Sequence, residues 1–258
     1  MQAEEDEFHN LSINERLSVL LFDNESLLIE REYDFEEVDF STLTNGEFDR
    51  LVDEILGYRK FVKIERSRSS SRAIISSIGK ARWSNKSRLD GFSSSYRDIK
   101  AILQASGMKD GDTFVDLGAS YGRVGCVVGT NFPNTQFIGY EIVPERCIEA
   151  QRITQFLQLD DTVKYLCEDI SADDFVIPDA DWYFLYDSLN NKTLAHVFKK
   201  IYQTGNNPDA RLIAKHTGSH QKYSDSPYLE LISSVKGISD LGKCCFYRLK
   251  QLSQGDVV

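Results

Sequence analysis

Residues 116–122, with the sequence DLGASYG, form a short turn that could bring the backbone close to a ligand. A predicted strand over 113–117 leads into the turn and a predicted helix begins at Arg123, while the glycines allow a ligand to approach the main chain. The spacing Gly-x-Ser-x-Gly differs from the G-x-G-x-x-G of dinucleotide-binding proteins, which would require glycine at Arg123. Because a carboxylate repels a pyrophosphate, Asp116 beside the turn favours a ligand that carries an ammonium and a sulfonium.

Two further acidic residues follow the next predicted strands along the chain. Glu141 ends a strand over 136–141, 19 residues beyond Gly122, where a carboxylate can accept hydrogen bonds from both hydroxyls of a ribose. Asp169 ends a strand over 163–169, where it can accept a hydrogen bond from an exocyclic amine or merely cap the following turn. The three acids together describe a nucleoside whose sugar and base contact carboxylates and whose tail is not a phosphate.

The elements that must position these residues alternate between strand and helix patterns from about residue 93 onward. We expect strands over 113–117, 136–141, 163–169, 181–187, 210–216, 236–240 and 244–250. We expect helices over 95–106, from Arg123, from Pro144, over 191–202 and over 226–235. This alternation predicts an α/β fold with a doubly wound, mainly parallel seven-stranded sheet, in which ligands bind at the carboxyl ends of the strands.

The chain before residue 92 has a different pattern. We expect a helical N-terminal extension over 1–91, acidic and then basic, followed by the ligand-binding domain over 92–258. Apolar spacing predicts short amphipathic helices in the extension, at Leu17, Leu20 and Leu21, at Leu27 and Leu28, and from Phe48 to Leu56.

The charge of the chain is unevenly distributed. Residues 1–54 carry 17 acidic and 3 basic side chains, whereas residues 55–100 carry 12 basic and 3 acidic ones. The basic stretch could meet a polyanion, but it can equally fold against its acidic neighbour, and charge runs most often cover a solvated face.

The chain resembles the class I S-adenosylmethionine-dependent methyltransferases in three segments. These are DLGASYG, the glutamate of FIGYE, and the EDI after the third predicted strand. The resemblance covers about residues 92–250 and departs from the family at Ser120, where the family more often has glycine. It implies an enzyme with a Rossmann-like methyltransferase domain and S-adenosyl-L-methionine as its cofactor. The residues that it implies for cofactor binding are Asp116, Gly118, Ser120, Gly122, Glu141, Asp169, Ser94 and Tyr96.

Residues 91–125 carry a narrower likeness. Their sequence, together with GYEIVPE and ARLIAKH further on, is similar to the disruptor-of-telomeric-silencing type of lysine methyltransferases and their small prokaryotic relatives, although the usual proline of that group is missing. Polar residues ahead of the first helix help to close over the cofactor in that group, which implies this role for Ser94, Ser95 and Tyr96. The same residues could instead only cap the helix. The likeness favours a protein lysine as the methyl acceptor, with RNA or a small molecule as alternatives.

Asp187 and His216 follow the fourth and fifth predicted strands, where the methyl group is expected to lie. Methyl transfer is an in-line displacement that aligns donor and acceptor and can need a base, so either side chain could act on the acceptor. His216 could equally be a hydrogen-bonded structural imidazole. The sequence DSLN lacks the [DNS]-P-P-[FYW] signature of enzymes that methylate exocyclic or amide nitrogens. We predict no metal, because the Asp-Asn pair of a magnesium-assisted site is absent after the fifth strand.

The composition of the chain excludes several other classes of protein. Five scattered cysteines with no CxxC pair favour a reducing, cytoplasmic environment over a disulfide framework or a structural zinc site. The acidic N-terminus and the absence of an apolar run of ~20 residues argue against a signal peptide and a membrane span.

We favour a protein acceptor over nucleic acid, because the basic stretch shows no row of aromatic residues for base stacking. A module that binds cofactor or partner without turnover is the alternative of another class, whereas a nicotinamide oxidoreductase conflicts with Asp116 and the glycine spacing.

Overall fold

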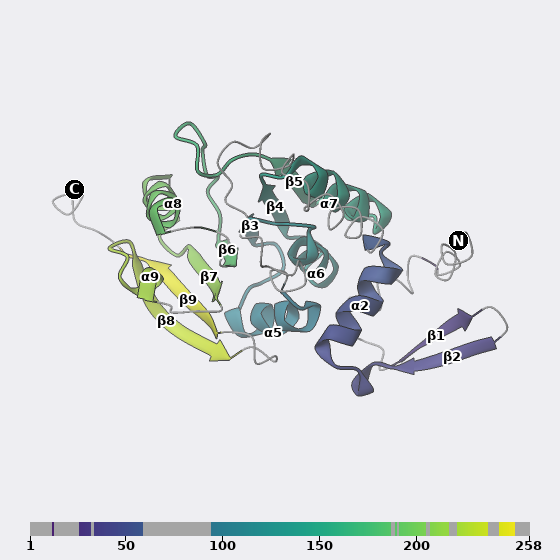
Figure 1. Ribbon diagram of the computed structural model, residues 1–258. Helices are drawn as coiled ribbons and strands as arrows, with labels where there is room; N and C mark the ends of the chain where they lie inside the picture. The colour runs from purple at the N-terminus through teal and green to yellow at the C-terminus, as the bar shows by residue number, and fades with distance from the viewer. Residues whose placement is uncertain are drawn as a thin grey trace.

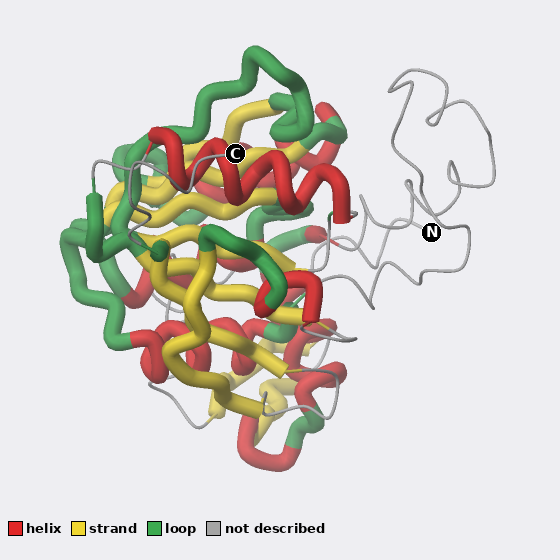
Figure 2. Tube along the Cα trace, turned by 90° about the vertical axis from the view of Figure 1, so that its left-hand side faces the viewer, coloured by secondary structure: helices red, strands yellow, loops and turns green. Residues whose placement is uncertain are grey.

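The structure is a computed structural model that describes residues 12, 26–31, 34–58, 94–186, 189, 191–204, 207–216, 221–236 and 243–250. Seven of the described strands form one sheet with helices on both faces (Figure 1, Figure 2). β9 runs antiparallel to both of its neighbours, and the other pairs are parallel, so the predicted doubly wound, mainly parallel seven-stranded sheet is confirmed. The spatial order is β5 (Val163–Cys167), β4 (Gln136–Glu141), β3 (Thr113–Leu117), β6 (Trp182–Tyr186), β7 (Arg211–His216), β9 (Lys243–Leu249) and β8 (Leu229–Lys236).

The order of the strands reverses at β3. From β3 the chain passes through α6 (Arg123–Asn131), β4 and α7 (Pro144–Phe156) to the edge strand β5, and then returns to β6 on the other side of β3. Helix α8 (Asn191–Thr204) then connects β6 to β7, and the short helix α9 (Gln221–Ser224) precedes β8. Ligands of doubly wound sheets bind outside the carboxyl ends of the strands at such a reversal. The turn that follows β3 lies at this point.

Alternate side chains of the central strands enter two separate apolar layers. On β3, Phe114 packs with the layer of α5 (Tyr96–Ser106), α6 and α7, whereas Val115 and Leu117 pack with the layer of α8. Because both faces are buried, the central strands read as almost continuous apolar runs. Asp116 in β3 and Lys215 in β7 are buried charged residues within these runs.

The N-terminal part of the described chain contains a hairpin where the apolar spacing predicts a helix. Leu27 and Leu28 lie in β1 (Ser26–Arg31), which pairs antiparallel with β2 (Asp34–Asp39), so this helix prediction is wrong. A short apolar run fits a strand and a buried helix equally well by periodicity, and here six ladder pairs with β2 satisfy the backbone as a strand. The helix predicted at Leu17 lies outside the described residues.

Helix α2 (Asn45–Ile55) confirms the helix predicted from Phe48 onward, and the 3-10 helix η1 (Phe40–Thr42) precedes it. Thr44 and Glu47 form a capping box at its start, which satisfies two backbone donors reciprocally. Its apolar face enters the same layer as α5, α6 and α7. η1 and α2 therefore share a core with the sheet. The predicted boundary between residues 91 and 92 lies outside the described residues and stays a prediction.

The C-terminal helix predicted over 226–235 is also wrong, because this segment forms β8. Leu229, Ile232 and Val235 recur every third residue, which resembles helical spacing. The structure shows a register shift between Leu231 and Ser233, and such a bulge breaks the strict alternation that would have indicated a strand. Pairing with β9 along the sheet edge then decides the conformation.

Candidate functional site

The turn between β3 and α6 has a backbone conformation that few residues adopt. Gly118 and Gly122 have φ values of +108° and +86°, and Ser120 between them has +52°. These values lie in the left-handed region, which glycine enters freely and serine rarely. The N–H groups of Gly118 and Ala119 donate to the carbonyl of Tyr140 on β4, at 2.9 and 2.8 Å. The protein itself therefore holds the turn in one shape against the sheet.

Tyr165 on β5 packs directly beneath this turn. Its hydroxyl donates to the carbonyl of Gly122 at 2.8 Å. A Cβ atom at Gly122 would lie 2.6 Å from the same hydroxyl oxygen, and one at Gly125 would lie 2.0 Å from it. Since interiors are close-packed, a larger residue at either position would force the tyrosine or the helix to move. Glycine at both positions lets α6 begin close to the sheet.

Glu141, the last residue of β4, connects the turn to the start of α7. One carboxylate oxygen accepts the N–H of Ser120 and the other accepts the N–H of Val143, both at 2.9 Å. The guanidinium of Arg146 lies 4.0 Å away, and Glu141 is 5% exposed. Because both oxygens are held, the carboxylate is fixed in orientation at the carboxyl edge of the sheet.

Asp116 is the second buried acid of this edge. It lies next to the last residue of β3, in register with Gly139 of β4 and Phe184 of β6, and is 2% exposed. Burial, together with the nearby charge of Glu141, raises the pKa of Asp116 well above its ordinary value. A bound cation would favour the ionised form of Asp116, whereas a bound anion would oppose it. The edge is therefore suited to a cationic ligand.

We expect the Asp116→Asn variant to be more stable than the wild type at neutral pH in the absence of ligand. The pKa of Asp116 is raised in the folded state above its unfolded value of about 3.9, so the stability that this carboxyl contributes is lost as the pH rises above about 4. We expect this advantage to be larger at about pH 8 than at about pH 4. Denaturant unfolding at both pH values measures it, and an equal advantage at both would contradict the explanation.

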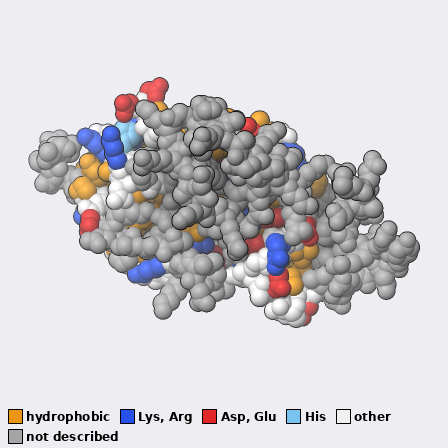
Figure 3. Space-filling model, in the orientation of Figure 1, with side chains coloured by type: hydrophobic (Ala, Val, Ile, Leu, Met, Phe, Trp, Pro, Cys, Tyr) orange, Lys and Arg blue, Asp and Glu red, His pale blue; other side chains and the backbone are white. Residues whose placement is uncertain are grey.

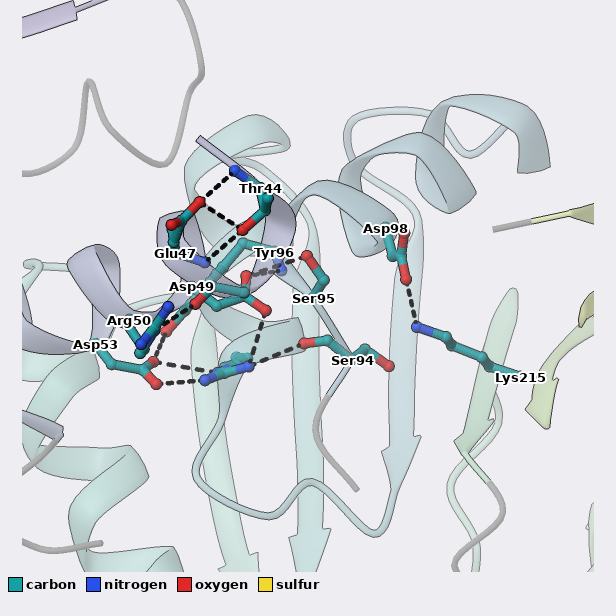
Figure 4. Close-up of polar contacts among 12 residues, drawn as sticks. Thr44, Glu47, Asp49, Arg50, Asp53, Ser94, Ser95, Tyr96, Asp98 and Lys215 are labelled. Atoms are coloured by element: carbon teal, nitrogen blue, oxygen red, sulfur yellow. Dashed lines mark hydrogen bonds and ion pairs between the residues drawn. The ribbon is translucent and has the colours of Figure 1, made fainter. Parts of the chain in front are cut away.

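Ser94, Ser95 and Tyr96 lie at the start of α5 and face α2 (Figure 4). The Ser95 hydroxyl and the Tyr96 N–H both donate to the carboxylate of Asp49, at 3.1 and 3.0 Å. The Tyr96 hydroxyl donates to Asp53 at 3.0 Å, and the tyrosine is fully buried. The Ser94 hydroxyl is also buried and has no hydrogen-bond partner among the described residues. Of the three side chains, that of Ser94 keeps a polar group for a ligand.

Asp169 lies two residues beyond the end of β5 and is exposed. One of its carboxylate oxygens accepts the N–H and the hydroxyl of Ser171, at 2.9 and 2.6 Å. This is the turn-capping arrangement that the sequence also allows. Its contact with a base amine stays a prediction.

Solved structures share this arrangement of strands and helices. TrmN from Thermus thermophilus matches with a TM-score of 0.50 and 13% identity, over 59% of this chain and 48% of its own, so the chain spans about half of TrmN. One chain of the Haloferax volcanii complex that contains the Trm112 methyltransferase activator matches with a TM-score of 0.51 and 14% identity, over 60% of this chain and 88% of its own.

This protein has the Rossmann-like fold of these methyltransferase structures. An RNA methyltransferase from Salinibacter ruber in complex with S-adenosyl-L-homocysteine also matches, with a TM-score of 0.46 and 15% identity over 62% of this chain and 95% of its own. Neither a protein-family model nor a curated protein matches the sequence. At identities of 13% and 14%, the first two matches establish the methyltransferase fold, and the activity depends on the residues of the site.

In this methyltransferase fold, the two candidate catalytic residues belong to the ends of β6 and β7. Asp187 directly follows Tyr186, the last residue of β6, and lies outside the described residues. His216 is the last residue of β7 and pairs with Lys243 of β9, but its side chain lies outside what the structure describes. The catalytic roles of both residues stay predictions.

The methyltransferase fold also joins charged residues that the sequence patterns do not single out. Lys215 of β7 and Asp98 of α5 form an ion pair of 2.9 Å, and both side chains are almost fully buried (Figure 4). The ammonium of Lys215 also lies 5.2 Å from the ring centroid of Tyr186. A lysine within the apolar strand ARLIAKH is the sequence signal that could have indicated a buried cation here.

No group of three or more His, Cys, Asp or Glu side chains among the described residues could hold a metal ion, and the expectation of no metal stays a prediction. No described helix is long and apolar enough to cross a membrane.

Proposed function

We propose that this protein is an S-adenosylmethionine-dependent methyltransferase. The observation that carries the proposal is the pair of buried carboxylates, Asp116 and Glu141, beside a preformed turn where the strand order reverses. A ligand with a phosphate would place its negative charges beside two acidic side chains, whereas the cationic tail of a nucleoside would be attracted to them. The class I methyltransferase fold supports the same ligand.

The described residues fit this cofactor. Each carboxylate oxygen of Glu141 accepts one backbone N–H, and an ionised carboxylate oxygen has a further lone pair for a ribose hydroxyl. Asp116 is suited to the ammonium of the amino-acid tail, and the buried Ser94 hydroxyl offers a further hydrogen bond. When bound, S-adenosylmethionine supplies the methyl group, which passes from its sulfonium sulfur to the acceptor.

We propose Asp187 and His216 for the chemistry on the acceptor. β6 lies beside β3 and β7 lies beside β6, so both residues belong to strand ends next to the proposed cofactor turn. A base at either position would take the proton that an acceptor nitrogen must lose before it can attack. The protein's main contribution would be to hold the acceptor in line with the methyl group.

We propose a protein lysine as the acceptor, and the support for this choice is the likeness of residues 91–125 to the lysine methyltransferases. RNA and a small molecule are the alternatives. On the face drawn in Figure 3, the visible described Lys and Arg side chains lie in small groups near Asp and Glu side chains. Of the basic stretch over 55–100, residues 59–93 lie outside the described part.

S-adenosylmethionine and S-adenosylhomocysteine are expected to raise the melting temperature, and NAD is expected not to. A ligand at 100 times its Kd stabilises by about 2.7 kcal/mol, which is several degrees for a chain of this size. A thermal-shift series with the three ligands measures this, and an equal shift with NAD would contradict the proposal. Transfer of a radiolabelled methyl group to protein or RNA fractions then distinguishes an enzyme from a module that binds without turnover.

A further inference from the structure

Arg123 is a cation at the first position of α6, directly after the proposed cofactor turn. Its guanidinium donates to the carboxylate of Asp53 through Nε at 3.2 Å and through a second nitrogen, and lies 3.6 Å from that of Asp49. It also donates to the carbonyl of Ser94 at 3.3 Å and stacks 4.8 Å from the ring centroid of Tyr96. The cation is therefore enclosed by groups from α2 and from the start of α5.

The position of this cation is unfavourable for the proposed ligand. A helix N-terminus already carries a positive partial charge, and Arg123 adds a full positive charge to the same end of α6. Burial lowers the pKa of Arg123, but the neighbouring Asp53, Tyr96 and Asp49 more than offset this, so the pKa is raised and the guanidinium stays charged. A ligand with an ammonium and a sulfonium would be repelled unless nearby acids compensate for that charge.

The compensating acids both come from α2. Asp49 and Asp53 are four residues apart, so they lie on one face of the helix, and Figure 4 shows both pointing toward the start of α5. The helix is held in place by its buried residues Phe48, Val52 and Ile55. The following segment reaches the turn itself, where the Tyr58 hydroxyl donates to the carbonyl of Tyr121 at 2.7 Å.

We infer that Asp49 and Asp53 are specificity-determining residues of the cofactor site, which neutralise Arg123 so that the turn over 118–122 accepts a cationic ligand. The inference rests on the proposed function and makes α2 a part of the cofactor-binding unit. Neither acid touches the ligand. They act through Arg123, whose charge they cancel.

The test compares the sulfonium cofactor with its neutral thioether product. S-adenosylmethionine carries one more positive charge than S-adenosylhomocysteine. An uncompensated Arg123 therefore weakens the binding of S-adenosylmethionine more than that of S-adenosylhomocysteine. We expect the double variant Asp49→Asn/Asp53→Asn to raise the ratio of the two dissociation constants, that of S-adenosylmethionine over that of S-adenosylhomocysteine, by about tenfold. This is about threefold for each of the two carboxylate charges removed, as for unit charges roughly 12 Å apart at an effective dielectric constant of about 40. Isothermal titration calorimetry on the full chain measures both constants.

A merely structural role of the two acids would change both affinities alike and leave the ratio unchanged. Two further variants separate the explanations. Adding Arg123→Gln to the double variant is expected to restore the ratio, and Arg123→Gln alone is expected to shift it in the opposite direction. The matched control is Glu47→Gln, which removes one charge from the exposed side of α2 and still permits a capping box.

The possible results are distinct. A wild type that binds neither ligand would overturn the proposed function and the inference with it. A wild type that binds both, with a double variant whose ratio is unchanged, would overturn the inference and leave the proposed function standing. Should the double variant fail to fold, Asp49→Asn alone keeps the closer pair of Arg123 with Asp53 and is expected to raise the ratio about threefold, half of the tenfold effect on a logarithmic scale.

Discussion

The Glu141→Ala variant is expected to bind S-adenosylmethionine at least about 100-fold more weakly than the wild type. Two ribose hydroxyls would lose hydrogen bonds to a charged acceptor, each worth about 1.5–3 kcal/mol, and 1.4 kcal/mol corresponds to a tenfold change in Kd. The N–H groups of Ser120 and Val143 would also lose their acceptor, so the turn would be less firmly held. Isothermal titration calorimetry measures the loss.

The matched control is Glu145→Ala. Glu145 is an exposed residue in the first turn of α7, and its replacement removes the same charge four residues away from Glu141. It is expected to change the Kd less than threefold, since a surface charge near the site acts through solvent. Glu141→Gln is expected to lie between the two, because one acceptor oxygen remains. If Glu141→Ala bound the cofactor as tightly as Glu145→Ala, the ribose would have to lie elsewhere.

The Lys215→Met variant is expected to lower the free energy of unfolding by about 3–5 kcal/mol. The carboxylate of Asp98 is 1% exposed and would lose the ammonium that lies 2.9 Å from it, and removing one partner of a buried ion pair costs about this much. Methionine has nearly the volume of the lysine side chain, so the packing against Tyr186 is retained. Urea unfolding or the melting temperature measures the change, and we expect a decrease of about 10 °C.

The double variant Lys215→Met/Asp98→Leu tests the cause of this loss. Replacing a buried ion pair by apolar residues of similar volume is often neutral, so we expect the double variant to regain most of the stability that the single variant loses. A double-mutant cycle gives the coupling energy. If the double variant were as unstable as the sum of both single variants, the ion pair would contribute little and the loss would come from packing.

Local patterns were sufficient to predict the central strands of the sheet and the glycine turn after β3. Each central strand of this fold is buried on both faces and each helix has an apolar stripe, so the alternation over 113–216 is visible in the residues themselves. The turn requires left-handed backbone at Gly118 and Gly122, and Glu141 places an acid at the end of β4. At each of these places, a short segment of the sequence is enough to indicate both the backbone conformation and the chemical group. The turn cap that Asp169 forms by accepting the N–H of Ser171 is local as well.

The errors fall where local spacing fits two conformations. Leu27 and Leu28 are compatible with a helix and with a strand, and only pairing with β2 decides between them. The bulge between Leu231 and Ser233 removes the alternation from an edge strand, so β8 resembles a helix until β9 is placed beside it.

By itself, the sequence determined the order of β3 to β7 along the chain, the glycine turn and the acids at the ends of β3 and β4, because each depends on neighbours within a few residues. Only the tertiary structure decided the charge balance of the site. Asp53 and Arg123 are 70 residues apart, and Asp98 and Lys215 are 117 apart. As isolated letters these are ordinary surface charges, and they become paired, buried groups only when α2, α5, α6 and β7 pack into one layer that excludes water from between them.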